Sequence, residues 1–118
     1  MRVNEVITES HHNFKTAYHI TTEEFAAEIM YGGLDPHDGN AYLVVDQGDP
    51  AKLRKDLHTV AGWMLAKTEN DDQPLTLLKI DITGIPLEKD YSWYVSKMPI
   101  PPERITDLGE GEFQRYAE

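Results

Sequence analysis

The strongest hydrophobic pattern in the chain lies between residues 50 and 67. Apolar side chains recur there at intervals of three and four residues, which predicts a helix with one buried face. Asp49 can cap the start of this helix, and Pro50 suits its first position because that position needs no backbone N–H. The apolar positions are Leu53, Leu57, Val60, Ala61, Met64 and Leu65.

A second helical pattern lies between residues 21 and 33. Thr21 and Glu24 have the spacing of a capping box, in which each side chain bonds the backbone at the helix start. Gly32 and Gly33 predict the end of the helix, because glycine adopts the left-handed C-terminal conformation easily. The apolar face predicted for this helix consists of Phe25, Ala26, Ile29 and Met30.

Five further segments have the β-branched, aromatic or compact apolar character of strands. They are residues 16–20, 41–46, 75–82, 91–98 and 104–108. Residues 83–90 have the composition of a loop, and the C-terminal tail is expected to be partly ordered, with Phe113 and Tyr116 able to dock. Early helices followed by late strands favour an α+β fold over repeated βαβ units.

Composition and charge narrow the possible functions. The 118 residues fit one domain, and the absence of cysteine excludes disulfides and cysteine-ligated metal sites. No apolar run approaches the ~20 residues of a membrane span, and the first ten residues lack the apolar core of a secretory signal, so we expect a cytoplasmic protein. With 11 Lys and Arg against 21 Asp and Glu, the net charge of −10 disfavours nucleic acid as a partner. This acidity fits simple solubility, a nucleic-acid mimic or a partner of basic proteins.

Two local groups of charged residues do not by themselves indicate a binding site. The densest basic group, KLRK at residues 52–55, lies on the predicted long helix and is typical of a solvated face. Asp35, His37 and Asp38 form only a weak set of metal ligands, and we expect no metal cofactor.

Residues 18–36, YHITTEEFAAEIMYGGLDP, combine a strand end, a histidine, a helix start and a helix stop. This segment resembles the first strand and helix of the ADP-ribosyltransferase superfamily, in particular its diphtheria-toxin and poly(ADP-ribose) polymerase branch. The later segments NAYLVVD and DPAKLRKDLHTVAGWML resemble the family's next strand and helix in order and spacing, and IPPERI resembles a late segment of small bacterial and phage members. The resemblance covers residues 16–108.

The resemblance implies an α+β domain over residues 14–118: an ADP-ribosyltransferase-like split, bent β-sandwich with two helices in the N-terminal half and a cleft that holds NAD as substrate. It also implies that His19 binds ribose hydroxyls, that Thr21 supports the loop around the nicotinamide half and that Tyr42 stacks on the nicotinamide ring. A neutral imidazole both donates and accepts hydrogen bonds, and an aromatic face attracts a flat cationic ring. The plainer interpretations are a structurally satisfied His19 and a core Tyr42 with its hydroxyl at the surface.

Active members of the family carry a late-strand glutamate that stabilises the oxocarbenium-like transition state as nicotinamide departs. A carboxylate does this electrostatically and as a hydrogen-bond acceptor. The resemblance aligns Ser92 or Trp93 with this position, so Asp90 or Glu103 is the candidate catalytic acid. The chain is then either an ADP-ribosyltransferase that modifies a host macromolecule or a catalytically inactive, acidic binding or inhibitor protein of the same fold.

Residues 1–13 are polar and predict a flexible N-terminal arm. The opening MRVNEVITES also resembles the packaging signal of proteins carried in the heads of large tailed phages. Such signals end in an Ile/Leu-x-Glu site for the prohead protease, which Ile7, Thr8 and Glu9 fit. This resemblance implies a phage protein packaged in the virion and delivered to the host cytoplasm, with a host protein as its target. The alternative is an ordinary arm.

Overall fold

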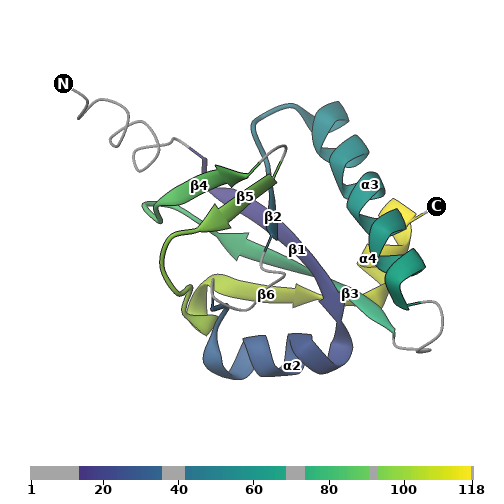
Figure 1. Ribbon diagram of the computed structural model, residues 1–118, viewed down its shortest axis with the longest axis horizontal. Helices are drawn as coiled ribbons and strands as arrows, with labels where there is room; N and C mark the ends of the chain where they lie inside the picture. Colours follow the sequence, from purple (N-terminus) through teal and green to yellow (C-terminus); the bar gives the residue numbers. More distant parts are fainter. Residues whose placement is uncertain (1–13, 36–41, 69–73, 91–92, 118) are drawn as a thin grey trace.

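The computed structural model of the chain describes residues 14–35, 42–68, 74–90 and 93–117 (Figure 1). These residues form an α+β fold with six strands and three α-helices, which confirms the predicted class. In chain order the elements are β1 (Thr16–Thr22), α2 (Glu23–Gly32), β2 (Tyr42–Val45), α3 (Pro50–Thr68), β3 (Leu75–Asp81), β4 (Leu87–Asp90), β5 (Trp93–Ser96), the 3-10 helix η1 (Pro102–Arg104), β6 (Ile105–Leu108) and α4 (Gly109–Ala117). The predicted arm, its packaging signal, His37, Asp38 and Ser92 lie outside the described residues.

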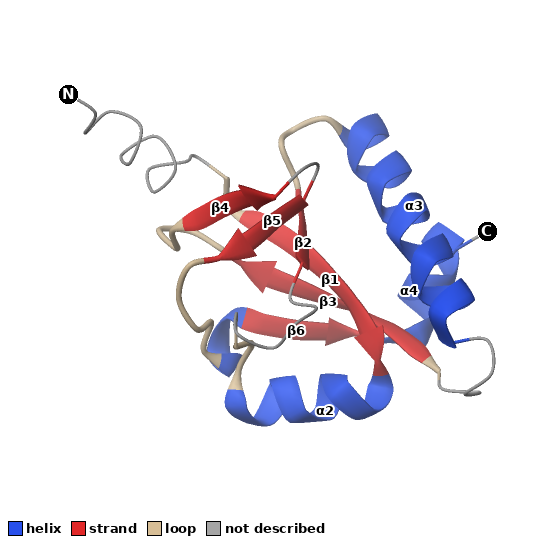
Figure 2. Ribbon diagram, viewed as in Figure 1, coloured by secondary structure: helices blue, strands red, loops and turns tan. Residues whose placement is uncertain are grey.

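The six strands form one antiparallel sheet with the order β4-β5-β2-β1-β3-β6 (Figure 2). The ladders between neighbouring strands differ in length. β1 and β3 share seven residue pairs, whereas β1 and β2 share two, Ala17 with Val45 and Tyr18 with Val44. β2 and β5 also share two residue pairs, so β2 has short ladders on both sides. We refer to β4-β5-β2 and β1-β3-β6 as the two halves of the sheet.

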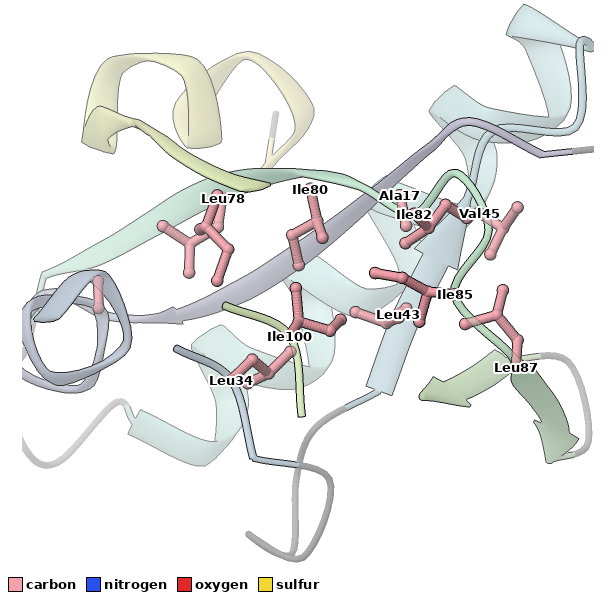
Figure 3. Packing of buried hydrophobic residues seen from close by; sticks show 12 residues of the cluster. Ala17, Leu34, Leu43, Val45, Leu78, Ile80, Ile82, Ile85, Leu87 and Ile100 are labelled. Atoms are coloured by element: carbon pink, nitrogen blue, oxygen red, sulfur yellow. The ribbon is translucent and has the colours of Figure 1, made fainter. Parts of the chain in front are cut away.

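Each face of the sheet has its own hydrophobic core, because successive strand residues point to opposite faces. The α2 face, covered by α2, gathers side chains from both halves of the sheet (Figure 3). The α3–α4 face lies on the other side, under α3 and α4 (Figure 1). The core of the α2 face consists of Ala17, Ala26, Leu34, Leu43, Val45, Leu78, Ile80, Ile82, Ile85, Leu87, Ile100 and Ile105. The core of the α3–α4 face consists of Ile20, Val44, Leu57, Ala61, Leu75, Leu77 and Phe113.

Helix α2 is capped one residue later than predicted. Thr22 is the N-cap, and its Oγ1 accepts a hydrogen bond from the N–H of Phe25 at 3.3 Å. The predicted capping box of Thr21 and Glu24 is wrong, because β1 continues through Thr22 and keeps Thr21 in its ladder with β3. Phe25, which the pattern assigns to the buried face, is 59% exposed, and Ala26 makes the buried contact instead.

The end of α2 agrees with the prediction and is fixed by a close backbone approach. Gly33 has a φ of 90°, and its N–H donates to the carbonyl of Ile29 at 2.7 Å. A Cβ at residue 33 would collide with the backbone carbonyl of Ile100. Leu34 then exchanges two backbone hydrogen bonds of 2.9 Å with Ile100. Glycine is therefore required here for both its φ and its small size.

The long helix and the five predicted strands are present, with bounds shifted by a few residues. Asp49 caps α3 as expected, since its Oδ1 accepts from the N–H of Lys52 at 3.2 Å. The aromatic segment 91–98 contributes only the shorter strand β5 to the described sheet.

Two elements differ from the prediction. Residues 87–90, predicted as part of a loop, form β4 at the edge of the sheet, with Leu87 buried and Glu88 and Lys89 exposed. Residues 109–117, predicted as a partly ordered tail, form α4, which buries Phe113 against the sheet as the docking prediction expected.

Candidate functional site

His19 lies in the middle of the sheet and links its two halves. The residue is 7% exposed, and its Nδ1 lies 2.8 Å from the backbone carbonyl oxygen of Tyr42. Because a carbonyl can only accept, the imidazole donates, and the proton is assigned to Nδ1. Nε2 therefore carries a lone pair and can accept a hydrogen bond.

The position of this bond follows from the strand pairing. The ladder between β1 and β2 ends at Tyr18 and Val44, one residue before His19. Beyond that point Tyr42 is paired with Val95 of β5, and β1 continues alongside β3. The imidazole thus connects β1 to β2 where their backbone ladder has stopped.

Burial sets the charge of His19. Burial lowers the pKa of the imidazole below its usual value of 6.5, and the hydrogen bond to the Tyr42 carbonyl opposes only part of that effect. The ring is therefore neutral at neutral pH. Within the part of the chain that the structure describes, Nε2 has no hydrogen-bond partner. A buried acceptor without a donor is uncommon in proteins and fits a site that a ligand or water completes.

Thr21 shares the α2 face with His19, because it lies two positions further along β1. It is buried and pairs with Thr76 of β3. The hydroxyl of Thr76 in turn donates to Oδ1 of Asp107 at 2.7 Å. A short polar seam therefore runs across this otherwise apolar face, from His19 and Thr21 to the exposed Asp107.

The sequence prediction missed part of this seam. In the predicted strand 75–82, Thr76 is the one polar residue on an otherwise apolar side. This was the only feature of the sequence that pointed to Thr76. Asp107 gave no signal of its own, because its partner lies 31 residues earlier in the chain.

Tyr42 lies on the opposite face of the sheet from His19. Leu43 belongs to the core of the α2 face and Val44 to that of the α3–α4 face, so alternation places the Tyr42 side chain with Val44. The phenol is 44% exposed. The structure therefore brings His19 to the backbone of Tyr42 but does not bring the two rings into one pocket.

The surroundings of Tyr42 on the α3–α4 face are aromatic. Trp93 of β5 lies on the same face, because Tyr42 pairs with Val95 two residues away. Trp93 packs edge to face against Trp63 of α3, with ring centroids 5.5 Å apart and planes at 84°. Trp93, one of the two positions aligned with the family glutamate, thus has a packing role.

The two candidate carboxylates lie far apart in the strand order. Asp90 ends β4, and Glu103 lies in η1 just before β6. These strands form the two opposite edges of the sheet, and neither is a neighbour of β1. The structure does not bring Asp90 and Glu103 together, and the exposed side chain of Glu103 faces solvent.

Arg104 gives the IPPERI segment a structural role. Its Nη1 donates to the carbonyls of Asp81 at 3.2 Å and Thr83 at 2.8 Å, and it lies 3.8 Å from the Asp81 carboxylate. These bonds attach η1 to the end of β3. The Arg104 guanidinium and a hydrogen bond to Thr83 lower the pKa of Asp81, with the Thr83 bond contributing more.

Comparison with protein-family models, with curated proteins and with solved structures finds no match for this chain. The described helices include none with the length and apolar character needed to cross a bilayer. The class that the fold defines is thus a small α+β domain with one antiparallel sheet.

Proposed function

We propose that this chain is an ADP-ribosyltransferase-like domain that binds NAD or ADP-ribose, with Nε2 of His19 accepting a hydrogen bond from a ribose hydroxyl. One observation carries the proposal: Nε2 of the buried, neutral imidazole can accept a hydrogen bond, and no described residue donates one to it. A ribose diol supplies the O–H donor that such a nitrogen needs. The buried hydroxyl of Thr21, two positions along the same strand, provides a second polar group beside it.

Two further features support the assignment to this superfamily. The segment 18–36 resembles the superfamily's first strand and helix, and His19 is the residue that the resemblance assigns to ribose. The short ladders on both sides of β2 support the split, bent β-sandwich that the resemblance implies, since a sheet with short ladders near its centre can open into two parts.

Transfer requires more than binding. A nucleophile of the macromolecule that receives ADP-ribose forms a bond to ribose C1″, and the bond from C1″ to the nicotinamide nitrogen breaks. Nicotinamide leaves, and the nucleophile's proton passes to a base or to water. The proposed acid for this step is Asp90 or Glu103, acting electrostatically on the developing positive charge. In this proposal a host macromolecule receives the ADP-ribose group, and the reaction takes place in the host cytoplasm.

A second candidate function is a catalytically inactive, acidic binding or inhibitor protein of the same fold. The positions of Asp90 and Glu103 favour it, because they lie at opposite edges of the sheet and away from β1. The placement of the Tyr42 ring on the other face from His19 favours it as well. In this version the ligand is bound at His19, but no glycosidic bond is broken.

Calorimetric titration with ADP-ribose and NAD tests the binding claim. In His19→Asn, the side-chain amide still donates to the Tyr42 carbonyl but leaves no acceptor at the Nε2 position. In His19→Gln, the amide oxygen reaches the Nε2 position. We expect His19→Asn to weaken binding about tenfold, the value of one lost hydrogen bond, and His19→Gln to weaken it less. No binding by the native chain, or equal binding by His19→Asn, contradicts the proposal.

Release of nicotinamide from NAD in host lysate separates the two candidates. An enzyme releases nicotinamide and labels a host macromolecule, and Asp90→Asn or Glu103→Gln reduces both. Binding of ADP-ribose without release favours the inactive binding protein.

A further inference from the structure

A basic pocket lies between α3 and α4, which pack side by side over the sheet (Figure 1). Its volume is about 330 Å³. The first turns of α3 and the last turn of α4 form its walls. Its lining residues are Ala51, Arg54, Lys55, His58, Arg115 and Tyr116.

The charge of this pocket is opposite to that of the chain. Acidic residues outnumber Lys and Arg by 21 to 11 in the whole sequence. Among the described residues, however, the pocket is lined by three Lys or Arg side chains and no Asp or Glu. Such a local reversal in a chain of net charge −10 focuses a positive potential in a concave site.

Two of the three cations have no neutralising partner. Within the described residues, the side chains of Arg54 and Lys55 make no ion pair or hydrogen bond. Arg115 differs, because Glu112 binds its Nη1 at 2.9 Å. The adjacent Lys52, which does not line the pocket, is paired with Asp56 at 2.8 Å. Within the basic group 52–55, the two unpaired cations therefore line the pocket, whereas the paired Lys52 does not.

His58 holds the pocket in shape. Its Nδ1 donates to the carbonyl of Tyr116 at 2.8 Å, which joins α3 to the last turn of α4. The other ring nitrogen, Nε2, points away from this bond and is available to a ligand. The start of α3 adds a favourable helix dipole for an anion, while the C-terminal end of α4 opposes it and Arg115 offsets that opposition.

We infer that this α3–α4 pocket binds a small phosphorylated molecule. The guanidinium of Arg54 suits phosphate oxygens, which it can bind in pairs, and Lys55 adds a compact positive charge. The volume is near the lower limit for small-molecule sites and fits one or two phosphate groups. A polynucleotide is excluded as occupant because the rest of the acidic surface repels its backbone.

This site goes beyond the proposed function and is independent of it. His19 points to the α2 face, whereas the pocket lies among the helices of the α3–α4 face, so the sheet separates them. A ligand bound in one does not touch the other.

Calorimetric titration of the full chain with pyrophosphate, in buffer of low ionic strength, tests the inference, with ADP as a second arm that adds a nucleoside. The test variant is Arg54→Gln/Lys55→Gln. Its matched control is Lys15→Gln/Lys89→Gln. This control removes the same charge from an exposed residue beside β1, Lys15, and from an exposed residue on β4, Lys89. We expect the test variant to weaken pyrophosphate binding about tenfold or more and the control to weaken it less than about twofold.

Two results overturn the inference. One is the absence of pyrophosphate binding by the native chain; the other is an equal loss in test and control variants, which reflects net charge alone. ADP binding that is tighter than pyrophosphate binding and is weakened equally by Arg54→Gln/Lys55→Gln identifies a nucleotide as the ligand of this pocket. Tighter binding of pyrophosphate identifies a simpler phosphate compound. Because the sheet separates the two sites, we expect His19→Asn to leave pyrophosphate affinity unchanged, so failure of this inference is distinguishable from failure of the proposed function.

Discussion

His19 and His58 make the same hydrogen bond in opposite surroundings. Each donates from Nδ1 to a backbone carbonyl at 2.8 Å, His19 to Tyr42 and His58 to Tyr116. His19 is buried and bridges β1 to β2 within the sheet. His58 makes its bond on an exposed helix, beside two unpaired cations.

The comparison shows that a histidine's local bond does not decide what it can bind. In both residues the bond fixes the ring through Nδ1 and leaves Nε2 without a hydrogen-bond partner among the described residues. Around His19 the low dielectric favours a neutral acceptor and a ligand with a hydroxyl donor. Around His58 the water and the neighbouring positive charges favour an anion.

The largest expected effect comes from disturbing the α2 face alone. Gly33→Ala combines an unfavourable positive φ with a collision against Ile100, and we expect it to lower the free energy of unfolding by about 3 kcal/mol or more. Gly48→Ala is the matched control, because Gly48 has a φ of 86° but open space around its Cβ position. Urea unfolding measures both. A cost for Gly33→Ala no greater than that for Gly48→Ala contradicts the close contact.

Alanine substitution of each histidine compares how much the two hydrogen bonds contribute to the free energy of unfolding. His19→Ala leaves a cavity and a Tyr42 carbonyl without its donor, so we expect a loss of about 2–3 kcal/mol in the free energy of unfolding. His58→Ala removes an equal bond from an exposed site, where water replaces it, and we expect about 0.5–1 kcal/mol. Urea unfolding at neutral pH compares the two variants. Equal losses would mean that burial does not distinguish the two rings.

The smallest expected effect is a pH dependence that belongs to His19. The pKa of His19 is lower in the folded chain than its unfolded value of about 6.5, so the unfolded state binds a proton first as the pH falls. The native chain therefore loses stability relative to His19→Asn as the pH falls below that value, and the difference is constant above it. Urea unfolding of both proteins between neutral and mildly acidic pH tests this. A difference that does not change with pH shows that burial does not penalise the charged ring.

Helix α3 and the end of α2 follow from the sequence because their signals are local. Helical periodicity, Asp49 at a cap and Gly33 at a stop each act within a few residues. The start of α2 shows the limit of such signals. Thr21 has the better local signal, because Glu24 follows it by three residues, but the length of the β1–β3 ladder makes Thr22 the cap.

The missed elements depend on contacts that lie far away in the sequence. β4 is a short edge strand with charged exposed residues, and it exists because it pairs with β5. α4 contains two glycines and is stabilised by docking Phe113 against β3 and α3. Neither partner is visible from the local pattern.

The candidate site was predictable only in part. The sequence singled out His19 at a strand end and Thr21 at a helix start, whereas the structure places both on β1 and on the α2 face. The face of Tyr42 depends on where the β1–β2 ladder ends, which no local signal sets. The basic pocket needs Arg54 and Lys55 of α3 to meet Arg115 of the unexpected helix α4, so KLRK alone could not indicate it.

Proton–nitrogen correlation NMR of the His19 ring, recorded before and after addition of ADP-ribose, tests the central claim most directly. We expect a neutral ring with its proton on Nδ1, and we expect the Nε2 resonance to move on addition of ADP-ribose while that of Nδ1 stays in place. An Nε2 resonance that does not respond to ADP-ribose, or a ring with its proton on Nε2, would contradict the account.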